Sequence, residues 1–147
     1  MRDASFILRS AYFSRLNGIQ YQGNQVPVYD SYADVGEASP YIVLAEISDY
    51  SIDNKGSFEQ TYLFTVDVVT EFPEGSNQGR MMSEQIADLV LQAILPNLVT
   101  DIDLGPDFEL VELRKVNGQS LTERSDTTKV FRKVLQFSNL VNQLSDG

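Results

Sequence analysis

The sequence predicts an α+β fold, in which two helices pack on one face of an antiparallel sheet of four to five strands, in the order α-β-β-β-α-β-β. Three observations lead to this prediction. Residues 4–16 and residues 80–95 each repeat apolar side chains at spacings of three and four. Residues 57–71 instead alternate apolar and polar side chains. No linker or internal repeat divides the chain, so residues 1–147 are expected to form a single domain.

The first helix is expected to end at Asn17-Gly18, a typical helix stop. The residues that fall at spacings of three and four along it are Ile7, Leu8, Ala11, Tyr12 and Arg15. A short strand, a turn at Gly23-Asn24 and a second strand near Val26–Tyr32 are expected next. Pro27 lacks an N–H donor, which favours a sheet edge for that second strand.

Two long strands are expected to follow, over residues 40–50 and 57–71, joined by a turn at Asp53–Gly56. Pro40 stops any helix, and the unbroken apolar run after it indicates a strand that is buried on both faces at its start. The second strand should have an apolar face with Phe58, Tyr62, Phe64, Val66 and Val68. Its polar face should carry Glu59, Thr61, Thr65, Asp67 and Glu71.

The second helix, over residues 80–95, is expected to end at Pro96. Its buried stripe is predicted as Met82, Ile86, Leu89, Val90 and Ala93, and Met81 is also expected in the core. The remaining elements are predicted as a strand at 107–116, a turn at Asn117-Gly118, an extended arm around 119–127, a strand at 128–141 and a flexible tail at 142–147.

Composition limits the classes of function that the chain can have. It has 147 residues, a formal net charge of −10, and neither cysteine nor histidine. Disulfides, thiolate nucleophiles and the commonest general base and metal ligand are therefore missing. A net negative charge opposes tight binding to nucleic-acid phosphates. No apolar run approaches the ~20 residues that cross a bilayer.

Charge is distributed unevenly along the chain. Residues 16–79 hold ten acidic residues and one basic residue, Lys55. Residues 114–133 hold six basic residues and only two acidic ones, Glu123 and Asp126. Opposite patches at different places on one subunit complement a neighbouring copy, and such head-to-tail contacts form rings when the rotation closes. The basic run could also contact phosphate, but its two acids and its strand setting favour an ion-pairing surface.

Few residues suggest catalysis. A carboxylate cluster, made of Asp101, Asp103, Asp107 and Glu109, contains an Asp-x-Asp pair that could hold a hard cation, although solvated turn acids have the same pattern. Ser83 has no visible base partner and is expected at a helix start or on a helix surface. The glycines form no phosphate-binding loop.

Several short stretches of the sequence, in their order along the chain, resemble the tail-completion or tail-terminator proteins of tailed phages. They are Pro40–Leu44 (PYIVL), Val66–Thr70 (VDVVT) and the helix at Ile86–Leu95. In that family a first helix leads to a variable loop, a Pro-Tyr-Val/Ile strand, a second strand, a helix after a glycine-bearing loop, and a closing hairpin. The resemblance covers about residues 4–137, and the stretch QSLTERSDTT makes the closing hairpin longer than the pattern requires.

The resemblance implies a structural virion protein of the neck or tail. Such proteins form a ring, here expected to hold six or twelve copies, that ends the tail tube, joins it to the head and lets duplex DNA pass as cargo. The implied partners are further copies of the chain, the tail-tube protein and neck or portal-side ring proteins, in a virion assembled in the host cytoplasm and without a membrane. The family has no catalytic residues, so none are assigned, and no cofactor or metal is expected.

A ring of this kind predicts where the charged residues lie. The acids expected at the lumen or at ring contacts are Asp30, Asp34, Glu37, Glu71 and Glu74. The basic edge expected between subunits consists of Arg114, Lys115, Arg124, Lys129, Arg132 and Lys133. Loop 30–39 or loop 72–80 is expected to face the channel or a neighbouring ring. Three alternatives stay open: another neck ring of similar fold, such as a head-completion protein, a carboxylate-based divalent-metal enzyme, and a small acidic adaptor or ligand-binding dimer.

Overall fold

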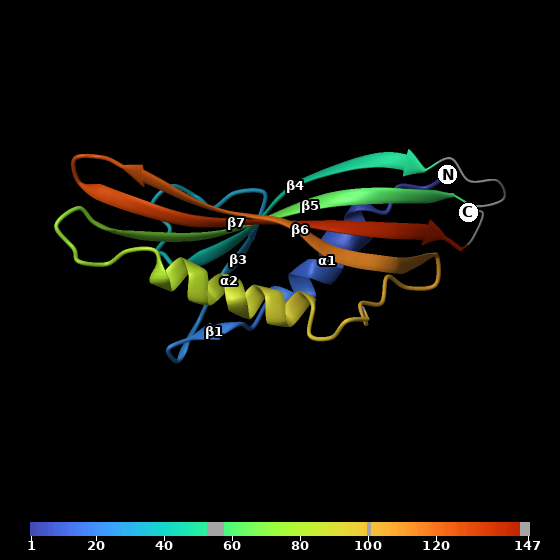
Figure 1. Ribbon diagram of the computed structural model, residues 1–147, viewed down its shortest axis with the longest axis horizontal. Helices are drawn as coiled ribbons and strands as arrows, with labels where there is room; N and C mark the ends of the chain where they lie inside the picture. The colour runs from blue at the N-terminus through green and yellow to red at the C-terminus, as the bar shows by residue number, and fades with distance from the viewer. Residues whose placement is uncertain (53–57, 100, 145–147) are drawn as a thin grey trace.

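The computed structural model describes residues 1–52, 58–99 and 101–144. A five-stranded sheet forms one long layer, and both helices lie against one of its faces (Figure 1). The elements are α1 (Ser5–Leu16), β1 (Gln20–Tyr21), β2 (Asn24–Gln25), β3 (Val28–Asp30), β4 (Tyr41–Ile52), β5 (Glu59–Pro73), α2 (Met81–Ile94), β6 (Phe108–Arg124) and β7 (Thr128–Gln143). The α+β class is confirmed. The turn expected at Asp53–Gly56 falls outside the described residues.

The sheet has the strand order β3-β4-β5-β7-β6. The four long strands are antiparallel to their neighbours, whereas the short β3 is parallel to β4, with Val28 beside Ile42. The predicted antiparallel pairing therefore holds for the long strands and not for β3. The loop at 31–40 is long enough to return the chain to the end where β3 began, as a parallel pair requires. Because β3 is outermost, the edge position that Pro27 favoured is confirmed.

β4 begins at Tyr41, directly after Pro40, and is buried on both faces over the next three residues, as predicted. The apolar face predicted for β5 is also confirmed for Tyr62, Phe64, Val66 and Val68. Phe58 was assigned to that face wrongly, because it precedes the strand and is 46% exposed. On the opposite face Thr61 and Val69 are buried too, where β5 lies between β4 and β7 inside the sheet.

The turn predicted at Asn117-Gly118 is wrong. Both residues lie inside β6, where the register with β7 shifts between Lys115 and Asn117, and the chain turns instead at residues 125–127. A bulge accommodates the Asn-Gly pair without ending the strand. A Cβ atom at Gly118 would lie 3.1 Å from Cε of the exposed Lys115, whose flexible side chain can move aside, so the bulge does not depend on glycine at this position.

The predicted arm around 119–127 is accordingly the end of the β6–β7 hairpin, and the expected tail begins too early, because residues 142–143 still belong to β7. The physical reason is the same in both cases. The two strands pair along almost their whole lengths, from Phe108↔Gln143 to Arg124↔Lys129. Residues 145–147 of the expected tail fall outside the described residues.

α2 buries a face that differs slightly from the predicted stripe. Its buried residues are Ser83, Ile86, Ala87, Val90 and Ile94, while Met82, Leu89 and Ala93 are only half-buried. Ser83 is at the helix start, as expected, but is buried rather than on the surface, and its hydroxyl donates to the Arg80 carbonyl (2.9 Å). That local bond lets a polar residue face the core, which the pattern of apolar residues alone does not reveal.

The centre of the core joins α1 to the sheet. The Tyr12 ring stacks on Phe64 with 4.5 Å between centroids and meets Phe137 edge-on at 5.8 Å. Its buried hydroxyl donates to Asn139 Oδ1 (2.6 Å), and Asn139 Nδ2 donates to the Tyr62 carbonyl (3.1 Å). Burial raises the pKa of Tyr12, so the phenol stays protonated and keeps its role as donor.

Arg9 fixes the outer edge of the sheet, which gives a first prediction. Its guanidinium pairs with Asp30 (2.9 Å), donates to the Leu44 carbonyl (2.8 Å) and lies over the Phe64 ring. We expect Arg9→Ala to lower the free energy of unfolding by about 1.5–3 kcal/mol, the range for a hydrogen-bonded charge. Urea denaturation measures this, with the exposed Arg114→Ala variant as control. Equal stabilities of the two variants would show that Arg9 does not hold the edge.

Candidate functional site

One end of the molecule gathers three segments that are far apart in sequence. The loop at 31–40, the loop at 74–80 and the β6–β7 turn lie together at the left of Figure 1. Ser39 Oγ accepts a hydrogen bond from the Glu71 N–H (2.9 Å) and donates to its carbonyl (3.0 Å). The Glu74 N–H donates to the Thr127 carbonyl (3.0 Å). We call this region, residues 31–40, 71–80 and 125–128, the loop end.

The loop end brings together four of the five acids expected at ring contacts and leaves one outside. Glu37 accepts a hydrogen bond from the Tyr29 hydroxyl (2.9 Å), and Glu74 pairs with Arg124, which lowers the pKa of Glu74. Asp34 and Glu71 are exposed there. Asp30 instead pairs with Arg9 on α1 and serves the fold.

Exposed apolar side chains accompany the acids at the loop end. Tyr32 is 72% exposed and Val35 is fully exposed, on either side of the exposed Asp34. No role was predicted for Val35, because a lone valine in an acidic loop gives no periodic signal. Aromatic residues are enriched in protein interfaces, so Tyr32 is the residue of this loop best suited to a contact.

The six residues of the expected basic edge do not form one edge. Arg114 pairs with Glu112 (2.8 Å), Arg124 with Glu74, and Arg132 lies 3.6 Å from Asp67 and 3.7 Å from Glu123. Lys129 donates to the Ser76 carbonyl. Strand alternation places Arg114 and Arg132 on the open face of the sheet, and Lys115, Lys129 and Lys133 on the helix side.

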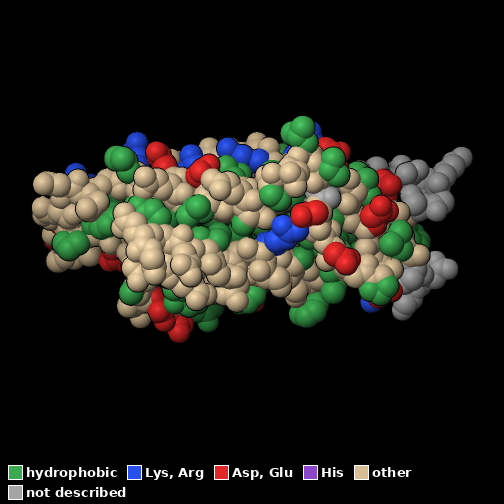
Figure 2. Space-filling model, turned by 90° about the horizontal axis from the view of Figure 1, so that it is seen from below, with side chains coloured by type: hydrophobic (Ala, Val, Ile, Leu, Met, Phe, Trp, Pro, Cys, Tyr) green, Lys and Arg blue, Asp and Glu red, His purple; other side chains and the backbone are tan. Residues whose placement is uncertain are grey.

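Lys115, Lys129 and Lys133 are thus the members of that set without an ion pair to the described part of their own subunit, and of these Lys129 is bonded to the Ser76 carbonyl. In Figure 2, which looks onto the helix side, Lys and Arg side chains lie mainly along the upper edge. Asp and Glu side chains gather mainly toward the right-hand end. Because three of the six basic residues already form ion pairs within the subunit, fewer basic groups are available to a neighbour than the sequence suggested.

Asp67, partly buried on the open face beside Arg132 and Glu123, gives a second prediction. Burial raises the pKa of Asp67 above its ordinary value of 3.8, and Arg132 offsets this only in part, while Glu123 adds to it. The folded state then binds the proton more tightly than the unfolded state, so ionisation at neutral pH costs stability. We expect Asp67→Asn to raise the free energy of unfolding at pH 7, with a gain that shrinks as the pH falls toward 3.8.

Urea denaturation across this pH range measures the effect, and the exposed Glu109→Gln variant is the matched control. A clear loss of stability in Asp67→Asn at pH 7 would mean that attraction to Arg132 outweighs the burial of the charge.

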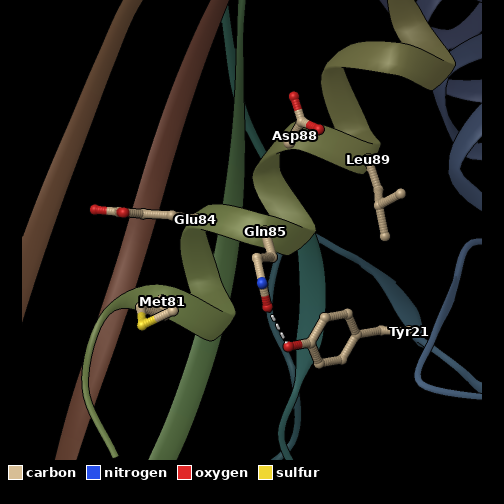
Figure 3. Close-up of a pocket in the computed structure, with 6 residues that line it drawn as sticks. All are labelled: Tyr21, Met81, Glu84, Gln85, Asp88 and Leu89. Carbon is tan, nitrogen blue, oxygen red and sulfur yellow. Dashed lines mark hydrogen bonds between the residues drawn. The ribbon is translucent and has the colours of Figure 1, made fainter.

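A groove of about 530 Å³ separates Tyr21 of β1 from α2 (Figure 3). The Tyr21 hydroxyl donates to Gln85 across it, and its charged lining residues, Glu84 and Asp88, are both acidic. Met81 lines the groove and is 74% exposed, so its expected place in the core is wrong. As the first residue of α2, Met81 lies beyond the part of the helix that packs on the sheet.

Three of the four carboxylates considered for metal binding serve separate partners, and the fourth, Glu109, is exposed. Asp101 pairs with Arg15, Asp107 with Arg2 (2.9 Å), and Asp103 accepts from the Gly105 N–H (2.8 Å). In the parts of the chain that the structure describes, no three carboxylates are placed to hold a metal ion. No helix among those residues is long and apolar enough to span a bilayer.

Known proteins add a comparison of fold. No family model and no curated protein matches the sequence. Among solved structures, a chain of the virion of a native gene transfer agent particle superposes with a TM-score of 0.74 at 18% identity, over 97% of this chain and 99% of that one. A second solved chain, whose name states no function, gives a TM-score of 0.50 at 20% identity, over 91% and 94%. At these identities the likeness establishes a shared fold.

Proposed function

We propose that the chain is a structural protein of a phage-type virion. In this proposal it forms a ring in the neck or tail, which ends the tail tube, joins it to the head and lets DNA pass. The observation that carries the proposal is the end-to-end likeness to a chain of a gene transfer agent virion, which leaves almost no part of either chain unmatched. The order of elements that resembles tail-terminator proteins supports it independently.

The charges fit a ring through which duplex DNA must slide. A net charge of −10 repels phosphate, so the ring would not hold the passing strand. Three of the basic residues in 114–133 are already neutralised by acids of their own subunit. The loop end, with the exposed Asp34, Val35 and Tyr32, is the surface best suited to contact the channel or the next ring.

Particles made without the chain test this proposal. We expect DNA-filled heads and separate tails in electron micrographs, and restored particles when the intact gene is supplied. Tails of uncontrolled length would identify a terminator of the tail tube, whereas heads that lose their DNA would identify a head-completion ring. Normal, joined particles would refute both roles.

Melting curves test the enzyme alternative. If the carboxylates at 101–109 held a divalent cation, magnesium, manganese or calcium would raise the melting temperature, and Asp103→Asn would remove the shift. Because three of these four carboxylates have separate partners, we expect no shift in either protein.

A further inference from the structure

The two borders of the sheet leave long stretches of backbone without a partner strand. β6 is an outermost strand of 17 residues, and within the described residues no strand lies beyond it. At the opposite border, β3 covers β4 only at Ile42, Val43 and Leu44. The outer side of residues 46–51 therefore also lacks a partner strand in the described part of the subunit. Unpaired edges of this kind are templates for adding a strand from another chain.

The two free edges lie at the same height in the sheet. Ser48 faces Leu63 across the β4–β5 pair, Leu63 faces Ser138, and Ser138 faces Arg114. Ser48 and Arg114 are therefore at the same position along the strand direction, which we call level with each other. The three antiparallel steps from β4 to β6 also make these two strands antiparallel to each other. A second copy laid beside the first in the same orientation would thus bring its β4 edge level with residues 110–116 of β6, as an antiparallel ladder.

The side chains at these edges have opposite charges. Exposed Glu46 and Asp49 lie on β4, and exposed Arg114 and Lys115 lie on β6. Ile47, next to Glu46, is level with Lys115 through Phe64 and Phe137. Asp49 is level with Leu113, one position from Arg114 and two from Lys115, so the opposite charges would meet as diagonal neighbours across the ladder rather than directly opposite one another.

The ladder between two subunits could extend only as far as β4 is not covered by β3. Farther along β6, Gln119 is level with Val43 through Val134 and Asp67, and Val43 is the residue that β3 covers. A neighbour's β6 can approach β4 only short of that height. The bulge between Lys115 and Asn117 lies at this point and bends β6 where it would have to leave the ladder.

We propose that residues 110–116 of β6 in one copy pair with residues 46–51 of β4 in the next, which makes a sheet that continues from subunit to subunit. The two edges are different surfaces, so the contact is heterologous: it cannot form a two-fold dimer, and it gives a ring when the rotation between neighbours closes. This inference rests on the proposed ring function and specifies its intersubunit contact.

Engineered cysteines test the pairing, since the chain has no cysteine of its own. Ser48→Cys and Arg114→Cys are prepared separately, mixed and mildly oxidised. Facing residues of adjacent strands lie within the Cα separation of roughly 4.4–6.8 Å that a disulfide requires. We expect a disulfide-linked dimer in the mixture and none in either variant alone. The Ser48→Cys/Arg114→Cys double variant should give a ladder of larger species.

Ser48→Cys mixed with Gln119→Cys is the matched control, because Gln119 is on the same strand and face as Arg114 but level with the part of β4 that β3 covers. A dimer from Arg114→Cys alone would indicate two-fold pairing of β6 with itself and would overturn the inference. Rings visible in micrographs without the mixed dimer would overturn it and leave the proposed function standing. Absence of both rings in particles and mixed dimers would overturn both.

Discussion

Replacing Phe64 with alanine is expected to lower the free energy of unfolding by about 3–5 kcal/mol, the range for a buried phenylalanine. The side chain is fully buried at the centre of β5, stacked against Tyr12 and covered by the Arg9 guanidinium. Its removal leaves a cavity between α1 and the sheet that neither rigid layer can close. Guanidinium denaturation followed by circular dichroism measures the loss.

The control for this prediction is Phe6→Ala on α1. Phe6 is 77% exposed, so we expect a change within about 0.5 kcal/mol. Comparable losses in the two variants would contradict the placement of α1, with Tyr12 inward and Phe6 outward.

Reversing the charges of Lys115 and Lys133 is expected to prevent assembly while leaving the subunit folded. Neither lysine has an ion pair to the described part of its own subunit and, unlike Lys129, neither is bonded to the Ser76 carbonyl, so an acidic neighbour is their natural partner. Like charges placed together across an interface cost several kcal/mol, and each 1.4 kcal/mol lowers an association constant about tenfold. We therefore expect the ring fraction of Lys115→Glu/Lys133→Glu, measured by sedimentation at low salt, to fall at least about tenfold.

The charge-preserving variant Lys115→Arg/Lys133→Arg is the control and should assemble like the original chain. High salt should weaken the ring of the original chain in the same direction as the reversal, because screening reduces contacts between exposed charges. Undiminished assembly of the reversed variant would contradict an electrostatic contact at these lysines.

Most of the long elements could be predicted from the sequence, because apolar residues repeat every three to four positions in a helix and every second position in a strand. The alternation over 57–71 predicted β5, and the apolar run after Pro40 predicted the start of β4. Prediction failed where a short sequence motif is compatible with two different structures. Asn117-Gly118 is typical of a hairpin turn, yet pairing along β6 and β7 absorbs it as a bulge. The parallel pairing of β3 depends on how the 31–40 loop folds back, which no period in the sequence expresses.

The candidate site was harder to predict than the fold. Counting charges showed that acids and bases are segregated, but not which of them neutralise each other. The Arg124–Glu74 pair joins residues 50 positions apart, and Arg132–Asp67 depends on strand register. The groove at Tyr21 and Gln85 forms between the β1–β2 hairpin and α2, so no single segment contains its signal.

A reconstruction of the junction between head and tail in intact particles tests the central claim most directly. Our account predicts a closed ring of this chain at that junction, with β6 of each subunit beside β4 of the next and duplex DNA passing through the hole without contacts from Lys115 or Lys133. A junction built without this chain, or a single copy with its β6–β7 hairpin lying along the nucleic acid, would contradict it.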